Sequence, residues 1–206
     1  PGESGTERLI PVALNELLIH TDLPLEDAIE VINLSSEPVS MDGWFLTDSV
    51  NELNRYRIPS GTTLSPNGFQ VFYEQAFNFT NPGIPFALSS AFGDRVLLVA
   101  TDAAGEPFQF VDDVEFGATQ NGISYGRFPD GTGAWTRLKD LSFGTDVRAG
   151  GNPADLSVFR TGSGAPNASP LVGPVYVKEI HYHPVDSGVE FVTIFNDADF
   201  PVALYD

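Results

Sequence analysis

The chain has 206 residues, with 10 Lys and Arg against 28 Asp and Glu, and a formal net charge of −18 at pH 7. Affinity for nucleic acids comes largely from cationic side chains that displace counterions from phosphates, so this charge argues against a nucleic-acid partner and against an anionic membrane. The chain has no cysteine, which excludes disulfides, thiol catalysis and cysteine-based zinc sites, and no apolar stretch is long enough for membrane insertion.

Short apolar segments separated by turn residues follow one another along the first two thirds of the chain. In chain order, the expected strands are 9–19, 28–34, 39–46, 55–58, 70–74, 95–101, 107–116 and finally 122–128. The 20 Gly and 16 Pro residues punctuate strands and break helices. No segment keeps a helical periodicity over three turns. The pattern predicts an all-β protein, a sandwich or a barrel.

Two blocks of the sequence match each other. Residues 11–20 align with residues 174–183 at an offset of 163, and apolar, turn and proline positions continue to agree in order beyond them. This agreement indicates an internal repeat. The second block stops at Asp206, before a counterpart of Trp44. We therefore expect the second copy to be incomplete. Two or three strands cannot bury a core of their own, so these strands would need other protein surface to cover them.

Five motifs resemble those of the lamin tail domain, in the form found in tandem in bacterial proteins. In order, they are Val12–Leu17, Ala28–Asn33, Pro38–Asp48, Ile58–Gly68 and Ser124–Trp135. The resemblance implies an immunoglobulin-like β-sandwich over residues 9–145 and the N-terminal strands of a second copy over 174–206. Between them, residues 146–173 are rich in Gly, Pro, Ala, Asn and Ser, a composition typical of a linker.

The resemblance also implies a role. Such domains are non-catalytic binding or spacer modules of larger exported bacterial proteins, which would place this chain outside the cell or at the cell surface. The chain opens at Pro1 with neither Met nor a signal peptide, so we expect a piece of a longer protein. The expected partner is a protein or a cell-surface ligand. The second-copy strands would either dock on the first domain or pair two chains into a homodimer.

The alternative function is a calcium- or carbohydrate-binding domain that accompanies an enzyme domain. It predicts either a groove lined by exposed aromatic side chains such as Phe77, Phe79 and Phe92 or an oxygen cage for calcium. Calcium is the one cofactor that the sequence suggests, through three acidic side chains in one loop, Asp22, Glu26 and Asp27. Oxygen ligands suit Ca²⁺, although the loop lacks the spacing of an EF-hand and its acidic residues also fit a plain solvated surface.

Two glutamates stand out because their strands are apolar on both faces. Regular alternation places Glu16 on the same face as Leu14, and Glu30 occupies the neighbouring predicted strand. A carboxyl group there must be paired or hydrogen-bonded. We favour a structural polar network of Asn15, Glu16 and Glu30 over an acid–base pair, because Thr193 replaces Glu30 in the second copy.

Overall fold

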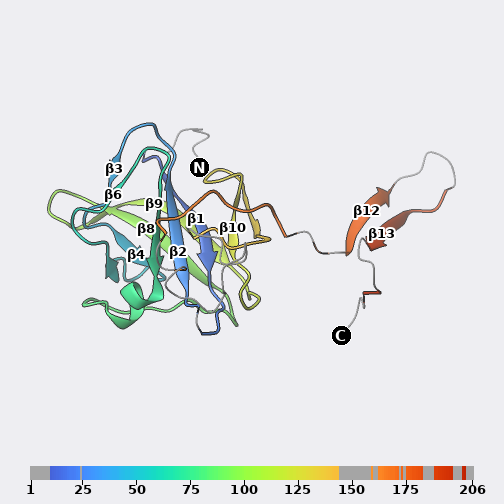
Figure 1. The fold of residues 1–206 in the computed structure, drawn as a ribbon, viewed down its shortest axis with the longest axis horizontal. Coiled ribbons are helices and arrows are strands. Elements are labelled where there is room, and N and C mark those ends of the chain that lie inside the picture. The colour runs from blue at the N-terminus through green and yellow to red at the C-terminus, as the bar shows by residue number, and fades with distance from the viewer. Residues whose placement is uncertain are drawn as a thin grey trace. The chain divides into compact units, whose positions relative to one another are not determined.

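The computed structural model describes residues 10–23, 25–143, 159, 162–171, 173, 175–182, 188–196 and 201–202. The chain divides into two compact units after Pro170 (Figure 1). The strands of the first unit are β1 (Val12–Leu18), β2 (Ala28–Asn33), β3 (Val39–Ser40), β4 (Phe45–Thr47), β5 (Tyr56–Arg57), β6 (Thr63–Leu64), β7 (Phe69–Tyr73), β8 (Asp94–Thr101), β9 (Pro107–Phe116), β10 (Tyr125–Phe128) and β11 (Ala134–Arg137). A short π-helical turn, η1 (Gln75–Phe79), follows β7.

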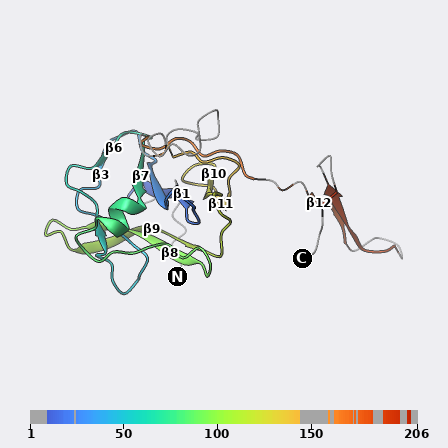
Figure 2. The same cartoon turned by 60° about the horizontal axis from the view of Figure 1, so that its bottom comes forward.

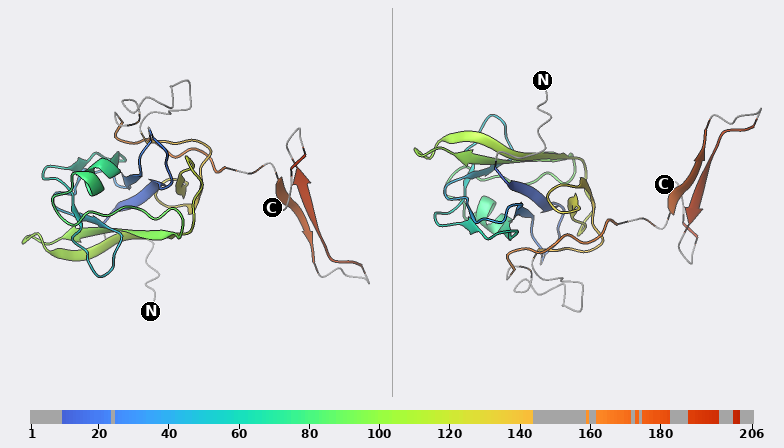
Figure 3. Two further views of the ribbon diagram at one scale, coloured as in Figure 1. Left: turned by 90° about the horizontal axis from the view of Figure 1, so that it is seen from below. Right: turned by 90° about the horizontal axis from the view of Figure 1, so that it is seen from above.

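The first unit is a sandwich of two antiparallel sheets. One sheet has the order β11-β10-β1-β2-β7 and the other β5-β4-β8-β9, and a small ribbon of β3 and β6 accompanies them. Figures 2 and 3 show the β8–β9 layer on one side of β1 and β2. The main core lies between the layers and includes Leu14, Leu17, Ile29, Leu46 and Leu98. This architecture confirms the predicted all-β, immunoglobulin-like sandwich.

Two local features differ from the sequence-based expectation. The sequence predicts 122–128 as the last strand of the sandwich, whereas β11 follows β10 and extends the first sheet. The register between β1 and β2 shifts at Asn15, which forms a bulge. Leu14 and Leu17 therefore both face the main core, whereas Glu16 and Leu18 face the outer side of the sheet. The prediction of one face for Leu14 and Glu16 is wrong, because a bulge adds one residue to the alternation.

The outer side of this first sheet is covered by residues that follow β11. We call the described residues 138–143, 159 and 162–170 the strap. Its apolar side chains Leu141, Phe143 and Phe159 are buried against Leu18 and Val71. A bridge between Leu138 and Pro170 joins the two parts of the strap.

The expectation of a linker over residues 146–173 is therefore wrong for Phe159 and for residues 162–170, which belong to the first compact unit. Phe159 is 1% exposed and packs edge-to-face against Tyr73 and Phe143. The Tyr73 hydroxyl also donates a hydrogen bond to the Phe159 carbonyl oxygen. The composition of residues 146–173, rich in small side chains, predicted that little of this segment would be buried. The outer side of the first sheet, however, presents apolar side chains such as Leu18 and Val71, and a few residues of the segment are enough to cover them. Residues 144–158 and 160–161 lie outside the described residues.

The substitution Phe159→Leu tests whether the strap contributes to stability. We expect it to lower the free energy of unfolding of the first unit by about 1–2 kcal/mol, because the aromatic contacts are lost and the site is imperfectly refilled. Phe92→Leu is the control, since Phe92 is 93% exposed and its replacement is expected to change little. The measurement is urea unfolding of both variants. If the two variants had the same free energy of unfolding, the packing of Phe159 would not contribute to the stability of the first unit.

The second unit is the hairpin of β12 (Val175–His181) and β13 (Phe191–Asn196). Its register repeats that of β1 and β2: each paired residue lies 163 positions after its counterpart, as in Val175↔Asn196 and Val12↔Asn33. The register shift also falls at the equivalent place in both hairpins. This agreement supports the internal repeat. In the part of the chain that the structure describes, no helix has the length and hydropathy needed to cross a membrane.

Candidate functional site

A pair of buried carboxyl groups lies between the first sheet and the strap. Glu16 and Glu30 are directly opposite each other on β1 and β2, and both are 0% exposed. Asn15 Nδ2 donates a hydrogen bond of 2.8 Å to Glu30 Oε1. The structure therefore brings together the three residues that the sequence suggests as a polar network.

Further members of this network come from distant parts of the chain. The second hydrogen of Asn15 Nδ2 is donated to Asp130 Oδ1 at 3.0 Å, and the Gly131 N–H donates to Asn15 Oδ1 at 2.8 Å. Gly131 has a φ of 60°, the left-handed conformation that glycine adopts without strain. The Asn167 N–H also donates to Asp130 Oδ1, at 2.9 Å. The sequence around Asp130 indicates only a turn, and nothing in it points to Asn15.

The strap is fastened to both glutamates by its own donors. Ser142 Oγ donates to Glu16 Oε2 at 2.7 Å, and the Ser142 N–H donates to the same oxygen at 3.2 Å. The Ala165 N–H donates to Glu30 Oε2 at 3.2 Å. At Gly164 a Cβ atom would lie 2.4 Å from Glu30 Oε2, so glycine is needed for this close approach.

Burial changes the protonation of the pair. Burial raises the pKa of Glu16 to about 7, although the Ser124 and Ser142 hydroxyls lower it in part. Burial, and next the neighbouring Glu16 carboxyl, raise the pKa of Glu30 well above its ordinary value. No Lys, Arg or His side chain of the described residues forms a hydrogen bond or ion pair with either glutamate. Burial therefore favours the neutral form of Glu30 more than in water, and the pair can hold the strap but cannot reach a substrate beneath it.

The acidic loop does not assemble the expected calcium site. Each of its three carboxyl groups binds a different partner: Asp22 accepts from the Asn121 side chain, Glu26 from the Gln75 N–H and Asp27 from the Thr21 hydroxyl. Within the described residues, no group of three or more His, Asp or Glu side chains could hold a metal ion. Burial, and next the nearby Glu74 carboxyl, raise the pKa of Asp27 to about 7.

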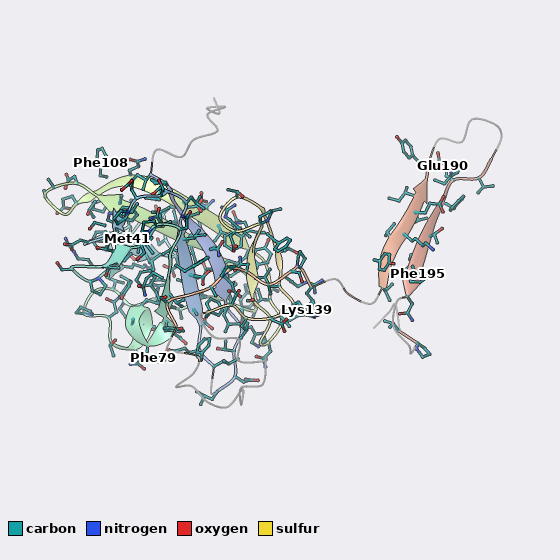
Figure 4. All side chains as sticks on the ribbon, turned by 45° about the horizontal axis from the view of Figure 1, so that its top comes forward. Met41, Phe79, Phe108, Lys139, Glu190 and Phe195 are labelled. Atoms are coloured by element: carbon teal, nitrogen blue, oxygen red, sulfur yellow. The ribbon has the colours of Figure 1, made fainter. Side chains whose placement is uncertain are left out.

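The aromatic groove suggested by Phe77, Phe79 and Phe92 does not form as a common face. Phe77 is 0% exposed because η1 turns it into the main core, where it stacks on Phe86. Phe79 and Phe92 are exposed, and Figure 4 labels Phe79.

An apolar surface that the sequence did not single out lies on the outer face of the second sheet. It consists of Phe45, Leu53, Val99, Phe108 and Phe110, and we call it the β9 surface. Val99 lies directly opposite Phe45 on β4 and Phe110 on β9. Phe108, labelled in Figure 4, is 73% exposed and Phe110 is 55% exposed, beside a hollow of about 50 Å³. The alternation of these two phenylalanines along 107–116 is the signal that could have revealed it.

The β9 surface lies on the edge strand of its sheet. β9 ends its sheet, and in the described part of the chain it pairs with β8 alone. Further along the same face lie Asp113 and Glu115, which share the Arg95 guanidinium at 3.3 and 3.6 Å. The surface therefore combines exposed aromatic side chains with an excess of negative charge, on the edge strand of its sheet.

Comparison with known proteins places this architecture in a family. The family model of the lamin tail domain matches residues 11–118, which is more than half of the chain. The chain belongs to the lamin tail domain family. Lamin tail domains are immunoglobulin-like interaction domains of a non-catalytic fold family, and the matched range here contains the carboxyl pair and the whole β9 surface. No curated protein and no solved structure matches the chain.

Proposed function

We propose that this lamin tail domain is a non-catalytic protein-interaction module of a larger exported bacterial protein, working outside the cell or at its surface. The β9 surface carries the proposal, because two neighbouring phenylalanines, Phe108 and Phe110, stay exposed on the edge strand of a sheet. Isolated exposed side chains are ordinary, whereas clustered aromatic groups beside a side-chain-sized hollow are typical of binding sites. The resemblance of the five sequence motifs to bacterial members supports the exported setting.

The expected binding mode is strand addition. An extended peptide segment pairs with the edge of β9 and places alternate side chains on Phe108 and Phe110 and in the hollow beside Val99. Asp113 and Glu115, together with the net charge of −18, favour a partner segment that also carries basic residues.

The carboxyl pair supports the non-catalytic assignment. General acid–base catalysis requires a carboxyl group within hydrogen-bond reach of a substrate. Glu16 and Glu30 are instead fully buried and occupied by donors of the strap. Calcium or carbohydrate binding has no comparable support. The three carboxyl groups of the acidic loop bind different partners within the described residues, and Phe77, which was expected to line a groove, is buried.

Selection from a phage-displayed library of random peptides tests the proposal. We expect the immobilised chain to enrich peptides with alternating apolar residues and a basic flank. The double substitution Phe108→Ser/Phe110→Ser should weaken binding of the selected peptides at least about tenfold. Phe79→Ser/Phe92→Ser removes two other exposed phenylalanines that lie outside the β9 surface, and it should leave binding unchanged. Enrichment that is insensitive to the first variant, or no enrichment at all, would exclude the β9 surface as the binding site.

A further inference from the structure

A hollow of about 330 Å³ lies where the end of β9, the loop of residues 117–123 and the β10–β11 pair meet. β10 and β11 are labelled in Figure 2. All residues that line the hollow belong to the first unit, and none of them belongs to the β9 surface. Binding sites for small molecules are concave and measure about 300–1,000 Å³. The volume therefore fits a small ligand, and a site here is independent of the proposed peptide binding.

Hydrogen bonds hold the loop that forms one wall of the hollow. The Thr119 N–H donates to the Ser90 carbonyl oxygen at 3.0 Å, and the Thr119 carbonyl oxygen accepts from His20 Nδ1 at 3.0 Å. The Gly122 N–H donates to the His20 carbonyl oxygen at 2.8 Å. A wall that is already fixed by such contacts reduces the entropy that a ligand must overcome on binding.

Another part of the hollow is apolar and aromatic. Phe116, Ile123 and Tyr125 line it. The Tyr125 ring stacks on Trp135 with the ring centroids 5.4 Å apart, which fixes the orientation of the tyrosine. Apolar walls of this kind favour ligands that can remove hydrocarbon surface from water. The hollow therefore suits a ligand with an apolar body.

The lining residues include one charged side chain, and it is an arginine. Arg137 lies directly opposite Tyr125 on the neighbouring strand, so both side chains lie on one face of the pair. Arg137 Nη1 donates to Gln120 Oε1 at 3.2 Å, and its guanidinium forms no ion pair with an acidic side chain of the described residues. A guanidinium binds a carboxylate through two parallel hydrogen bonds. This arginine is therefore available to a negatively charged ligand.

The polar groups around Arg137 also favour an oxygen-bearing ligand. Gln120 lines the hollow, and its side-chain amide N–H groups are further donors. Thr119 Oγ1 is buried and has no hydrogen-bond partner among the described residues. Buried hydroxyl groups are nearly always hydrogen-bonded, and an oxygen atom of a ligand in the hollow would supply the missing partner.

We propose that this hollow binds a small carboxylic acid with an apolar body. The carboxylate lies on the Arg137 guanidinium, and the body packs against Phe116, Ile123 and Tyr125. One guanidinium matches a single negative charge, whereas a phosphate monoester would bring a charge of about −1.5 to −2. A free acid and the C-terminal residue of a peptide present the same chemistry, and the experiment separates them.

Titration of the whole chain with phenylacetate, followed by two-dimensional NMR spectra of its amide groups, tests the proposal. We expect a dissociation constant of about 1 mM or below, and at least about tenfold weaker binding of phenylacetamide, which has the same shape without the charge. Arg137→Gln should weaken phenylacetate binding at least about tenfold. Arg57→Gln is the matched control, because it removes the same charge on the other sheet and should leave binding unchanged.

Three results would overturn the proposal. They are the absence of phenylacetate binding, equal binding of the amide, and equal binding to the chain with Arg137→Gln. The spectral changes should also cluster at residues 116–125 and 137, and changes confined to other residues would place the ligand elsewhere. A tripeptide that ends in phenylalanine separates the two sources: affinity equal to that of phenylacetate indicates a peptide end, and at least about tenfold weaker binding indicates a free acid.

Discussion

Raising the pH from 5 to 8 is expected to lower the stability of the first unit by about 3 kcal/mol through Glu16 alone. The pKa of Glu16 is raised from 4.5 to about 7 by burial, so the folded chain binds a proton there that the unfolded chain releases. This contribution is fully present below pH 4.5 and is lost as the pH rises through about 7. Glu30 acts in the same direction, because burial, and next the neighbouring Glu16 carboxyl, raise its pKa as well.

The double variant Glu16→Gln/Glu30→Gln should remove most of this loss, because neutral amides replace groups that must otherwise ionise in a buried site. Urea unfolding at pH 5 to 9 measures it, with tryptophan fluorescence as the signal. The two tryptophans, Trp44 and Trp135, both belong to the first unit, so the hairpin does not contribute. Asp27 also has a raised pKa, so Asp27→Asn serves as the control that removes a separate part of the pH dependence. If the free energy of unfolding of the glutamine double variant fell with rising pH as steeply as that of the unaltered chain, Glu16 and Glu30 would not be the source of the loss.

Asn15→Asp is expected to cost about 3–5 kcal/mol at pH 7, the largest effect of a single substitution predicted for this chain. Asn15 Nδ2 is the donor shared by Glu30 and Asp130, at 2.8 and 3.0 Å. Aspartate has no such donor when ionised, so it would place a fourth acidic group beside Glu16, Glu30 and Asp130, in a cluster that has only hydrogen-bond donors to stabilise it. One acceptor contact would survive, because an aspartate oxygen can still receive the Gly131 N–H.

The control for Asn15→Asp is Asn51→Asp, because Asn51 is exposed and the same chemical change there should alter stability by less than about 0.5 kcal/mol. Both variants are compared by urea unfolding at pH 7 and again at pH 5. The deficit of Asn15→Asp should shrink at pH 5, where protonation restores a donor at the cluster. A loss below about 1 kcal/mol at pH 7 would show that the network is open to water.

Local sequence patterns were sufficient for several features of this lamin tail domain. Short apolar runs between turn residues predicted the sandwich, and polar Asn15, Glu16 and Glu30 within apolar strands predicted a network. The motif matches predicted the family, which the family model confirms over residues 11–118. These features can be predicted because the alternation of side chains along a strand and the residue preferences of turns depend only on residues that are close together in the sequence.

Tertiary structure decided the rest of the site. The Gly131 N–H that donates to the Asn15 side chain comes 116 residues after Asn15 in the sequence. The Asn167 side chain, which donates to the Asn15 carbonyl oxygen, comes 152 residues after it. No local pattern encodes such pairings, since they depend on how the strap crosses the sheet. The same holds for the bulge at Asn15, which exchanges the faces that alternation predicts. Burial in the assembled sandwich, and not residue type, raises the pKa of Glu16 to about 7 and the pKa of Glu30 well above its ordinary value.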